Sequence, residues 1–391
     1  MAGRGRSAIF AAVAGVLVLA TVEAAFRIVF PLPQISNFNR VQYSELAPGT
    51  ADTQPPLMNA AVRWTSDPDH ASFVQSLNLY GFRDPVTWCQ KPPAGRRRVM
   101  FLGDSFVEGV MAEDAETIPR AFAAAAGPGV EAMNLGMGGT GLGHYIRLAA
   151  TAVPLFKPQL VVVVLYANDL PPPAFDPRWL VPHAHPVPFR RWLPRAAHVA
   201  LRALRGRTVP RRWHTKPFYF FGAVPAPTNP LSARAPGYEA LIEPALLDAM
   251  KRGRFNPYLS DHLARSAEAL VETADVRPHL AALAALARQN GATLAVAYVP
   301  HSLQVSDYYM AFALRYAVEK PVRSLMGPEY QRQAAAVAET CRSLEVPFVD
   351  FTPLLRVEEG SGRHLYWDYD NHMRAAGYGY VGRVLAERWA H

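Results

Sequence analysis

Four short stretches of the 391-residue sequence carry groups that together could transfer an acyl group. Ser105 follows the apolar run "VMFL" and a Gly-Asp pair, Asn168 and Asp169 follow "VVVVLY" and an alanine, and Asp370 and His372 lie near the end of the chain in "WDYDNHM". The fourth stretch, "NLGMGGTG", is rich in glycine and offers free backbone N–H groups. A serine beside an acid-supported histidine suits attack on a carbonyl carbon. An amide side chain and free N–H groups suit stabilisation of the resulting oxyanion.

These groups can meet only if the fold brings distant parts of the chain together. Gly-Asp-Ser alone is also typical of a turn followed by a helix cap. However, three of the stretches follow apolar runs that are typical of buried parallel strands. Five such runs occur, near residues 98–105, 130–139, 159–169, 292–300 and 346–353. The carboxyl ends of parallel strands lie side by side, so Ser105 and Asn168 are expected in one crevice.

Helical stretches alternate with these runs. They lie near residues 117–127, 142–155, 277–290, 330–344 and 375–388. The alternation predicts an α/β fold, a three-layer sandwich in which helices cover both faces of a five-stranded parallel sheet. The segment 171–260 breaks the alternation, is rich in proline and aromatic residues, and is predicted to be an insertion after the third strand.

The positive charge of the chain is concentrated in this insertion. Lys and Arg outnumber Asp and Glu by 40 to 32, and residues 177–238 hold eleven of the bases and no acid. No zinc-finger or RNA-binding signature accompanies them, which argues against nucleic acid as a partner. Basic side chains at helical spacing within 190–206 predict an amphipathic helix. Two interpretations of this helix stay open. Its basic face contacts anionic lipid headgroups, or it is an ordinary helix whose basic face is solvated.

Residues 1–30 are predicted to form a membrane anchor or a signal sequence. The stretch 8–26 is almost wholly apolar, and as a helix it would span roughly 28 Å, about the thickness of a hydrocarbon core. Arg4 and Arg6 precede it, which favours a single-pass protein of the bacterial inner membrane with its body in the periplasm. The alternative is secretion after cleavage before Ala25, because "VEA" carries small residues at suitable positions.

A linker rich in Pro and Asn is expected at 31–74, followed by one folded domain at 75–391 that the insertion interrupts. Cys89 and Cys341 are the only cysteines, too few for a disulfide scaffold. Whether they pair is open.

The four stretches resemble the four blocks of the SGNH (GDSL-type) hydrolase superfamily. They occur in its order, as "FLGDSFVEG", "NLGMGG", "YAND" and "DNH". Within the superfamily the chain is similar to the bacterial membrane-anchored members, because an "N-x-x-G-F-R-D" stretch precedes the first block, formed here by Asn78, Gly81, Phe82, Arg83 and Asp84. The resemblance covers about 75–170 and the tail from 346, and it implies a flavodoxin-like sheet.

The resemblance also implies roles for individual residues. Ser105 would be the nucleophile, His372 its general base, and Asp370 the acid that orients the histidine. The oxyanion hole would consist of the N–H groups of Ser105 and Gly139 and the side-chain amide of Asn168. Neither a metal nor an organic cofactor is implied.

Two positions depart from the family pattern. Tyr166 stands where the third block commonly has glycine, which would narrow the cleft or alter access to it. Asp370 stands two residues before His372 rather than three, so Asp368 is the fallback for orienting the histidine. Asp104 and Asp169, which adjoin two of the implied site residues, are secondary candidates, and so is Asp368.

The expected function is therefore that of an exported serine esterase that forms an acyl-enzyme. The expected partner is an acylated small molecule or glycan, with an acetyl ester on a carbohydrate first, and the membrane is the second partner. One alternative is a polysaccharide O-acyltransferase with the same triad. A different alternative is a non-catalytic glycan-binding envelope protein, whose sugar surface would use Tyr166 and the aromatic residues Trp213, Phe218, Tyr219, Phe220 and Phe221.

Overall fold

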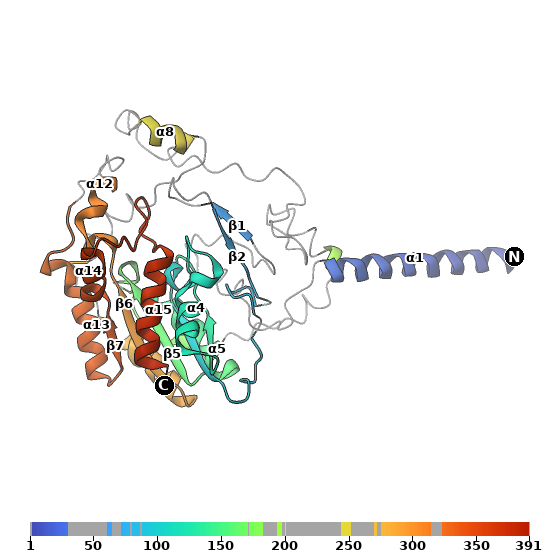
Figure 1. Ribbon diagram of the computed structural model, residues 1–391. Helices are drawn as coiled ribbons and strands as arrows, with labels where there is room; N and C mark the ends of the chain where they lie inside the picture. Colours follow the sequence, from blue (N-terminus) through green and yellow to red (C-terminus); the bar gives the residue numbers. More distant parts are fainter. Residues whose placement is uncertain are drawn as a thin grey trace.

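The structure is a computed structural model of the whole chain. It describes residues 2–29, 61–64, 72–78, 80–86, 88–170, 172–182, 194–197, 200, 244–251, 270–271, 275–313 and 323–390. Most of these residues form one layered body, from which the N-terminal helix α1 (Ala2–Val29) projects (Figure 1).

A parallel sheet of five strands forms the centre of the body, in the order β4-β3-β5-β6-β7. The strands are β3 (Arg97–Leu102), β4 (Val130–Asn134), β5 (Leu160–Tyr166), β6 (Thr293–Val299) and β7 (Phe348–Asp350). Each lies inside a predicted run, except that β3 begins one residue before its own run. Each strand is shorter than its run, because the residues that end the run belong to the turn or helix that follows. The chain moves from β3 to one neighbour, β4, and then crosses to the other, β5. This reversal marks the point at which ligands bind in such sheets.

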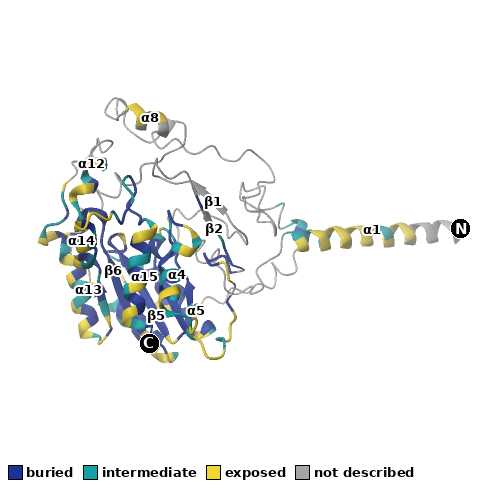
Figure 2. Ribbon diagram, viewed as in Figure 1, coloured by how far each residue is buried: buried dark blue, intermediate teal, exposed yellow. Residues whose placement is uncertain are grey.

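Helices cover both faces of the sheet, which confirms the predicted three-layer α/β fold. One face carries α4 (Ile118–Ala126), α14 (Thr352–Gly360) and α15 (Ala375–Trp389), and the other carries α5 (Leu142–Phe156), α10 (Arg277–Gln289) and α13 (Arg332–Ser343). Alternate residues of β5 enter the two cores, with Val162 and Val164 on the first face and Val161 and Val163 on the second. Figure 2 shows the sheet buried between the helical layers.

The helix α14 was not predicted. The five predicted helices agree with their ranges except for the fourth. There, a 3₁₀ turn, η6 (Pro328–Gln331), precedes α13, so the α-helix proper begins two residues later than predicted. α15 lies very close to α4, because a Cβ at Gly382 would come within 2.5 Å of the Ala121 Cβ. This close approach fixes the helix that follows Asp370 and His372 in the chain.

The segment predicted as a linker, 31–74, contains secondary structure near its end. β1 (Ala61–Trp64) and β2 (Ser72–Gln75) form an antiparallel pair, and Phe73 and Gln75 of β2 are buried. The linker prediction is thus wrong for these residues, because strands of four residues carry too little periodicity to be found in a sequence. The other domain boundaries stay predictions.

α1 contains one apolar stretch, Phe10–Val29, that is long enough to span a membrane, and none of it is buried in the body. A signal sequence has the same properties. The carboxylate of Glu23 accepts a hydrogen bond from the backbone N–H of Arg195, 2.6 Å away in the insertion. Residues 195–197 and 200 are helical, and the rest of the predicted basic helix 190–206 lies outside the described residues, apart from Pro194.

The described part of the insertion also contains the 3₁₀ turn η3 (Pro177–Leu180) and the helix α8 (Pro244–Lys251). The aromatic residues at 213 and 218–221 lie outside the described part. Cys89 is exposed and Cys341 is buried, and both are free thiols.

Candidate active site

The segment 103–109 lies directly after β3, and we call it the nucleophile turn after the role that is predicted for Ser105. Ser105 is the first residue of α3 (Ser105–Glu108), and Asp104 caps this helix by accepting a hydrogen bond from the Phe106 N–H at 2.9 Å. Burial raises the pKa of Asp104 to about 6, although the Phe106 N–H, the His372 ring and the Asn168 side chain lower it. Asp104 therefore holds the turn in shape, and Ser105 remains only partly buried.

The loop before α15 brings Asp370 and His372 to this turn. His372 Nε2 lies 2.8 Å from Ser105 Oγ, although 267 positions separate the two residues in the sequence. His372 Nδ1 lies 2.5 Å from Asp370 Oδ1, which also accepts the backbone N–H of His372 at 2.8 Å. A proton on Nδ1 shared with Asp370 leaves Nε2 as the acceptor for the serine hydroxyl.

Charge around the imidazole favours its protonated form. Burial alone would lower the pKa of His372, but the carboxylates of Asp370, Asp104 and Glu108 outweigh it and raise the pKa above its usual value. The ring is therefore suited to take a proton from Ser105 and hold it as an imidazolium ion.

The glycine-rich loop after β4 lies against α3. Gly136 allows this contact, since a Cβ there would stand 2.1 Å from the backbone nitrogen of Glu108. Hydrogen bonds from Met137 N–H to Gly103 O at 3.0 Å and from Gly138 N–H to Glu108 Oε2 at 2.7 Å attach the loop to the nucleophile turn. Gly139 comes next, is exposed, and has a φ of +72°, a conformation that favours glycine.

The 3₁₀ turn η2 (Ala167–Asp169) after β5 forms the other side of the site. The Asn168 side chain is exposed and interacts with the Asp104 carboxylate, which places it beside the nucleophile turn. Asp169 is buried and accepts hydrogen bonds from the Tyr166 N–H at 2.9 Å and the Tyr145 hydroxyl at 2.7 Å. It shapes the turn rather than facing Ser105.

Asp368, the fallback for orienting the histidine, is engaged by a nearby arginine. Its carboxylate accepts a hydrogen bond from Arg374 at 3.0 Å, and the Arg374 guanidinium lies over the Trp367 ring. Asp370 is thus the acid that the structure brings to His372, two residues before it in the sequence. Among the residues described, no cluster of three or more His, Cys, Asp or Glu side chains is arranged to hold a metal ion.

Comparison with known proteins identifies the family of the chain. Residues 101–380 match the GDSL-like Lipase/Acylhydrolase family. The chain belongs to this family. It is an ester-hydrolysing enzyme, and its parallel sheet is the SGNH hydrolase fold.

Solved structures similar to this GDSL-like acylhydrolase include a carbohydrate acetylesterase family member from Sinorhizobium meliloti, with 13% sequence identity and a TM-score of 0.36. The similarity covers 75% of this chain and 96% of that chain. A lipase/acylhydrolase from Enterococcus faecalis has 13% identity, 75% and 95% coverage and a TM-score of 0.36. The inhibitor-bound aryl esterase of M. Smegmatis has 14% identity, 75% and 97% coverage and a TM-score of 0.34. The search of curated proteins found no match.

One departure from the usual GDSL-like pattern, Tyr166, is fully buried. Its ring stacks on Phe106 with centroids 3.9 Å apart, and its hydroxyl accepts a hydrogen bond from Asn371 Nδ2 at 2.8 Å. Tyr166 is therefore not exposed in a cleft that it could narrow, and the alternative in which it offers a surface to a sugar is wrong. It lies behind the nucleophile turn and the histidine loop.

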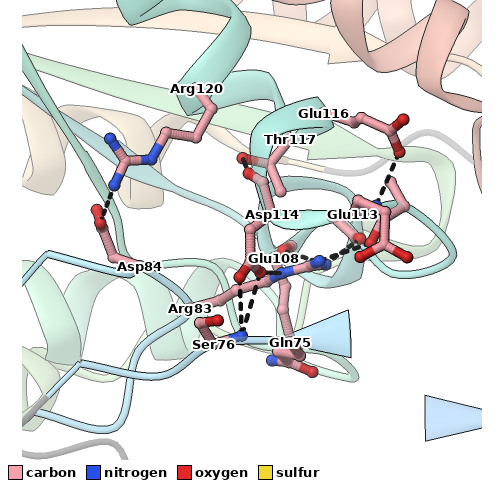
Figure 3. A network of polar contacts seen from close by, with 12 residues as sticks. Gln75, Ser76, Arg83, Asp84, Glu108, Glu113, Asp114, Glu116, Thr117 and Arg120 are labelled. Atoms are coloured by element: carbon pink, nitrogen blue, oxygen red, sulfur yellow. Dashed lines mark hydrogen bonds and ion pairs between the residues drawn. The ribbon is translucent and has the colours of Figure 1, made fainter. Parts of the chain in front are cut away.

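Sequence reasoning missed a polar network that joins the N-terminal segment to the nucleophile turn of this GDSL-like enzyme (Figure 3). Arg83, which is buried, bonds Asp114 Oδ1 at 2.9 Å, the Ala112 carbonyl at 2.6 Å and the Gly109 carbonyl. Gln75 bonds Glu108 at 2.6 Å. In the sequence, only the "GFRD" stretch and Glu108, three residues after Ser105, pointed to this network. Neither pattern predicts which residues they would contact.

Proposed function

We propose that the protein is an exported serine esterase with a catalytic triad of Ser105, His372 and Asp370. The observation that carries this proposal is the continuous chain of contacts from Ser105 Oγ through both ring nitrogens of His372 to Asp370 Oδ1. It lies at the carboxyl ends of β3 and β5, where an open parallel sheet binds ligands.

In this mechanism Ser105 Oγ attacks the ester carbonyl carbon while its proton passes to His372 Nε2. Asp370 stabilises the imidazolium ion that results. The proton then goes from His372 to the leaving alcohol oxygen as the bond between the carbonyl carbon and that oxygen breaks, which leaves an acyl-enzyme. Water attacks the acyl group through the same base, and the products are the free acid and Ser105.

The oxyanion of each tetrahedral intermediate would accept hydrogen bonds from the N–H groups of Ser105 and Gly139 and from the Asn168 side chain. Support for this assignment comes from the loop containing Gly139, which is bonded to the nucleophile turn, and from the Asn168 side chain, which lies against Asp104. Removal of one such donor typically lowers the rate by ~10²- to 10³-fold.

For the substrate, we propose a short acyl ester, an O-acetyl group on a carbohydrate of the bacterial envelope. The proposal rests on the apolar helix α1, which suits an anchor, and on the resemblance of "N-x-x-G-F-R-D" to bacterial membrane-anchored members. Arg4 and Arg6 before α1's apolar stretch favour the body in the periplasm.

Hydrolysis of p-nitrophenyl acetate, butyrate and octanoate by the wild type and by Ser105→Ala tests the function. We expect Ser105→Ala to lose at least about 10³-fold in kcat, since the triad acts as a unit, and we expect acetate to be the preferred acyl group. Ser361→Ala, in an exposed turn after α14, is the control and should retain full activity. An active Ser105→Ala variant would remove Ser105 from the mechanism.

The same assay with an acetylated glycan as donor and an unacetylated glycan as acceptor separates hydrolysis from transfer. Release of free acetate supports the esterase. Acetyl groups that appear on the acceptor in place of acetate would instead show an O-acyltransferase.

A further inference from the structure

Glu108 is a fully buried carboxylate three residues after Ser105, at the end of α3. Two segments that are far apart in the sequence donate to it. Gln75 Nε2 lies 2.6 Å from Oε1, and the Gly138 N–H lies 2.7 Å from Oε2. Figure 3 shows Glu108 beside Gln75 and close to Arg83.

The bond to Gly138 acts on the loop that carries the proposed oxyanion donor. Gly138 precedes Gly139 directly, and a Cβ at Gly138 would lie 3.6 Å from the Ser105 Cβ. Bonds between an N–H and an ionised carboxylate are about twice as strong as bonds between neutral groups. Glu108 is thus placed to fix the distance between Ser105 and the Gly138–Gly139 peptide.

Gln75 supplies the second partner that a buried carboxylate needs. Burial of a charge is costly unless hydrogen bonds replace its water. Gln75 belongs to β2, which lies before the first residue of the family match, 101. A strand outside the matched region therefore completes the surroundings of a group next to the nucleophile.

We propose that Glu108 and Gln75 are positioning residues that hold the Gly138–Gly139 turn at the correct distance from Ser105 for oxyanion binding. The proposal rests on the proposed serine esterase function. It makes β2, the last strand before the "GFRD" stretch, a working part of the active site.

Replacement of Glu108 by alanine removes the acceptor for both donors. We expect kcat per active site to fall about 10- to 100-fold, because a misplacement of about 1 Å can cost a factor of 10². KM should stay within about twofold, since the bond is proposed to act on the transition state. Gln75→Ala should lower kcat by a smaller factor, about three- to tenfold, because the Gly138 bond remains.

Glu108→Gln is the conservative variant. Its amide oxygen can still accept the Gly138 N–H, while its NH₂ group can donate to Gln75 Oε1, a buried oxygen, after the Gln75 amide flips. We expect kcat to recover to within about fivefold of the wild type. A purely structural role would give no such recovery of kcat at equal thermal stability.

The pH profile gives a second readout. The acids that face the His372 ring are Asp370 on its own loop and Asp104 and Glu108 on the nucleophile turn, and all three favour its protonated form. Removal of one negative charge in Glu108→Gln lowers the pKa of His372. The neutral base then persists to lower pH, so the acid limb of kcat/KM should move to lower pH.

Glu131→Gln and Glu131→Ala are the matched controls. Glu131 lies near the amino end of β4, is largely buried, and pairs with Arg98 at 2.6 Å. The Glu131 variants remove a comparable charge at the amino ends of the strands, whereas Glu108 lies beyond their carboxyl ends. They should lower the melting temperature while kcat per titrated site and the pH profile stay unchanged.

The decisive measurement is kcat normalised to active sites titrated with a fluorophosphonate, together with the melting temperature. The positioning role is refuted if Glu108→Ala and Gln75→Ala keep kcat within twofold of the wild type while Ser105→Ala is inactive. That result would leave the proposed esterase function intact. If Glu108→Ala fails to fold, the other two variants decide. The positioning role is then refuted if Gln75→Ala has the kcat of the wild type and Glu108→Gln has an unshifted pH profile. An active Ser105→Ala variant would instead overturn the proposed function.

Discussion

At the scale of single residues, Tyr166 links the three parts of the site. Its ring packs on Phe106 of α3, and Phe106 in turn lies 5.3 Å from the His372 ring between centroids. Its hydroxyl accepts the Asn371 side-chain N–H, from the residue between Asp370 and His372. Burial raises the pKa of Tyr166 well above 10, so this hydroxyl stays protonated and neutral. A glycine at this position would supply none of these contacts.

Tyr166→Phe should loosen the histidine loop without emptying the core. The ring contacts remain, but the Asn371 amide loses its buried acceptor, which typically costs about 1–3 kcal/mol of the free energy of unfolding. We expect kcat to fall about three- to tenfold with little change in KM, measured by ester hydrolysis and urea unfolding.

Tyr298→Phe provides the control on the neighbouring strand. Tyr298 is equally buried, pairs with Leu165 in the sheet register, and makes a longer hydrogen bond to Gln304, 3.3 Å. Loss of the hydrogen bond between Tyr298 and Gln304 should leave kcat unchanged. Equal effects of the two substitutions on kcat would show that Tyr166 has no special relation to the histidine loop.

At the scale of elements, the short helix α3 depends on the segment before the sheet. A helix of four residues leaves most of its terminal carbonyl groups without partners inside the helix. The Arg83 guanidinium bonds the Glu108 and Gly109 carbonyls at its end and the Ala112 carbonyl beyond it. Asp114, which balances this charge, also accepts the Ser76 N–H at 3.1 Å. The "GFRD" stretch therefore braces the nucleophile turn.

Arg83→Lys should destabilise the protein although the charge is kept. An ammonium group cannot reproduce the planar set of donors that reaches several carbonyls and Asp114 at once. We expect a loss of about 2–4 kcal/mol in the free energy of unfolding, measured by urea denaturation, because buried carbonyls lose partners. kcat should fall as the turn loosens.

Arg120→Lys is the comparison for this prediction. Arg120 pairs with the buried Asp84 of the same stretch, and its own side chain is 28% exposed, so an ammonium group can keep this ion pair while water solvates its other donors. Arg120→Lys should therefore lose less free energy of unfolding than Arg83→Lys. Equal losses in the two variants would contradict the special role of Arg83.

At the scale of the whole molecule, both ends of the folded body converge on one edge of the sheet. The N-terminal strand β2 reaches Glu108, and the loop before the C-terminal helix α15 reaches Ser105. α1 lies apart from this site, with the apolar stretch Phe10–Val29 unburied. The helix proposed as the anchor and the residues of the proposed site therefore belong to separate parts of the chain (Figure 2).

Cell fractionation tests the anchor. The full chain should stay with the membrane fraction, whereas a chain without residues 2–29 should be soluble and keep its kcat per titrated active site, since α1 adds no group to the site. N-terminal sequencing of the mature protein is the complement. A soluble mature protein that begins at Ala25 would contradict the anchor and show a cleaved signal sequence.

The sequence by itself determined the five strands, the main helices and the polar residues that follow the strands, because apolar runs and helical periodicity are local patterns. It also placed Ser105, Asn168, Asp370 and His372 at the ends of elements that a parallel sheet must bring together. The family match confirms the fold class and the ester-hydrolysing activity that the blocks predicted.

Only the tertiary structure decided which groups meet. It brings Asp370 rather than Asp368 to the imidazole, buries Tyr166, and joins Gln75 to Glu108 across 33 positions. The physical reason is that a hydrogen bond requires a distance of about 3 Å and a direction. These depend on how separate segments cross in space, and no local pattern of residue types specifies such a crossing.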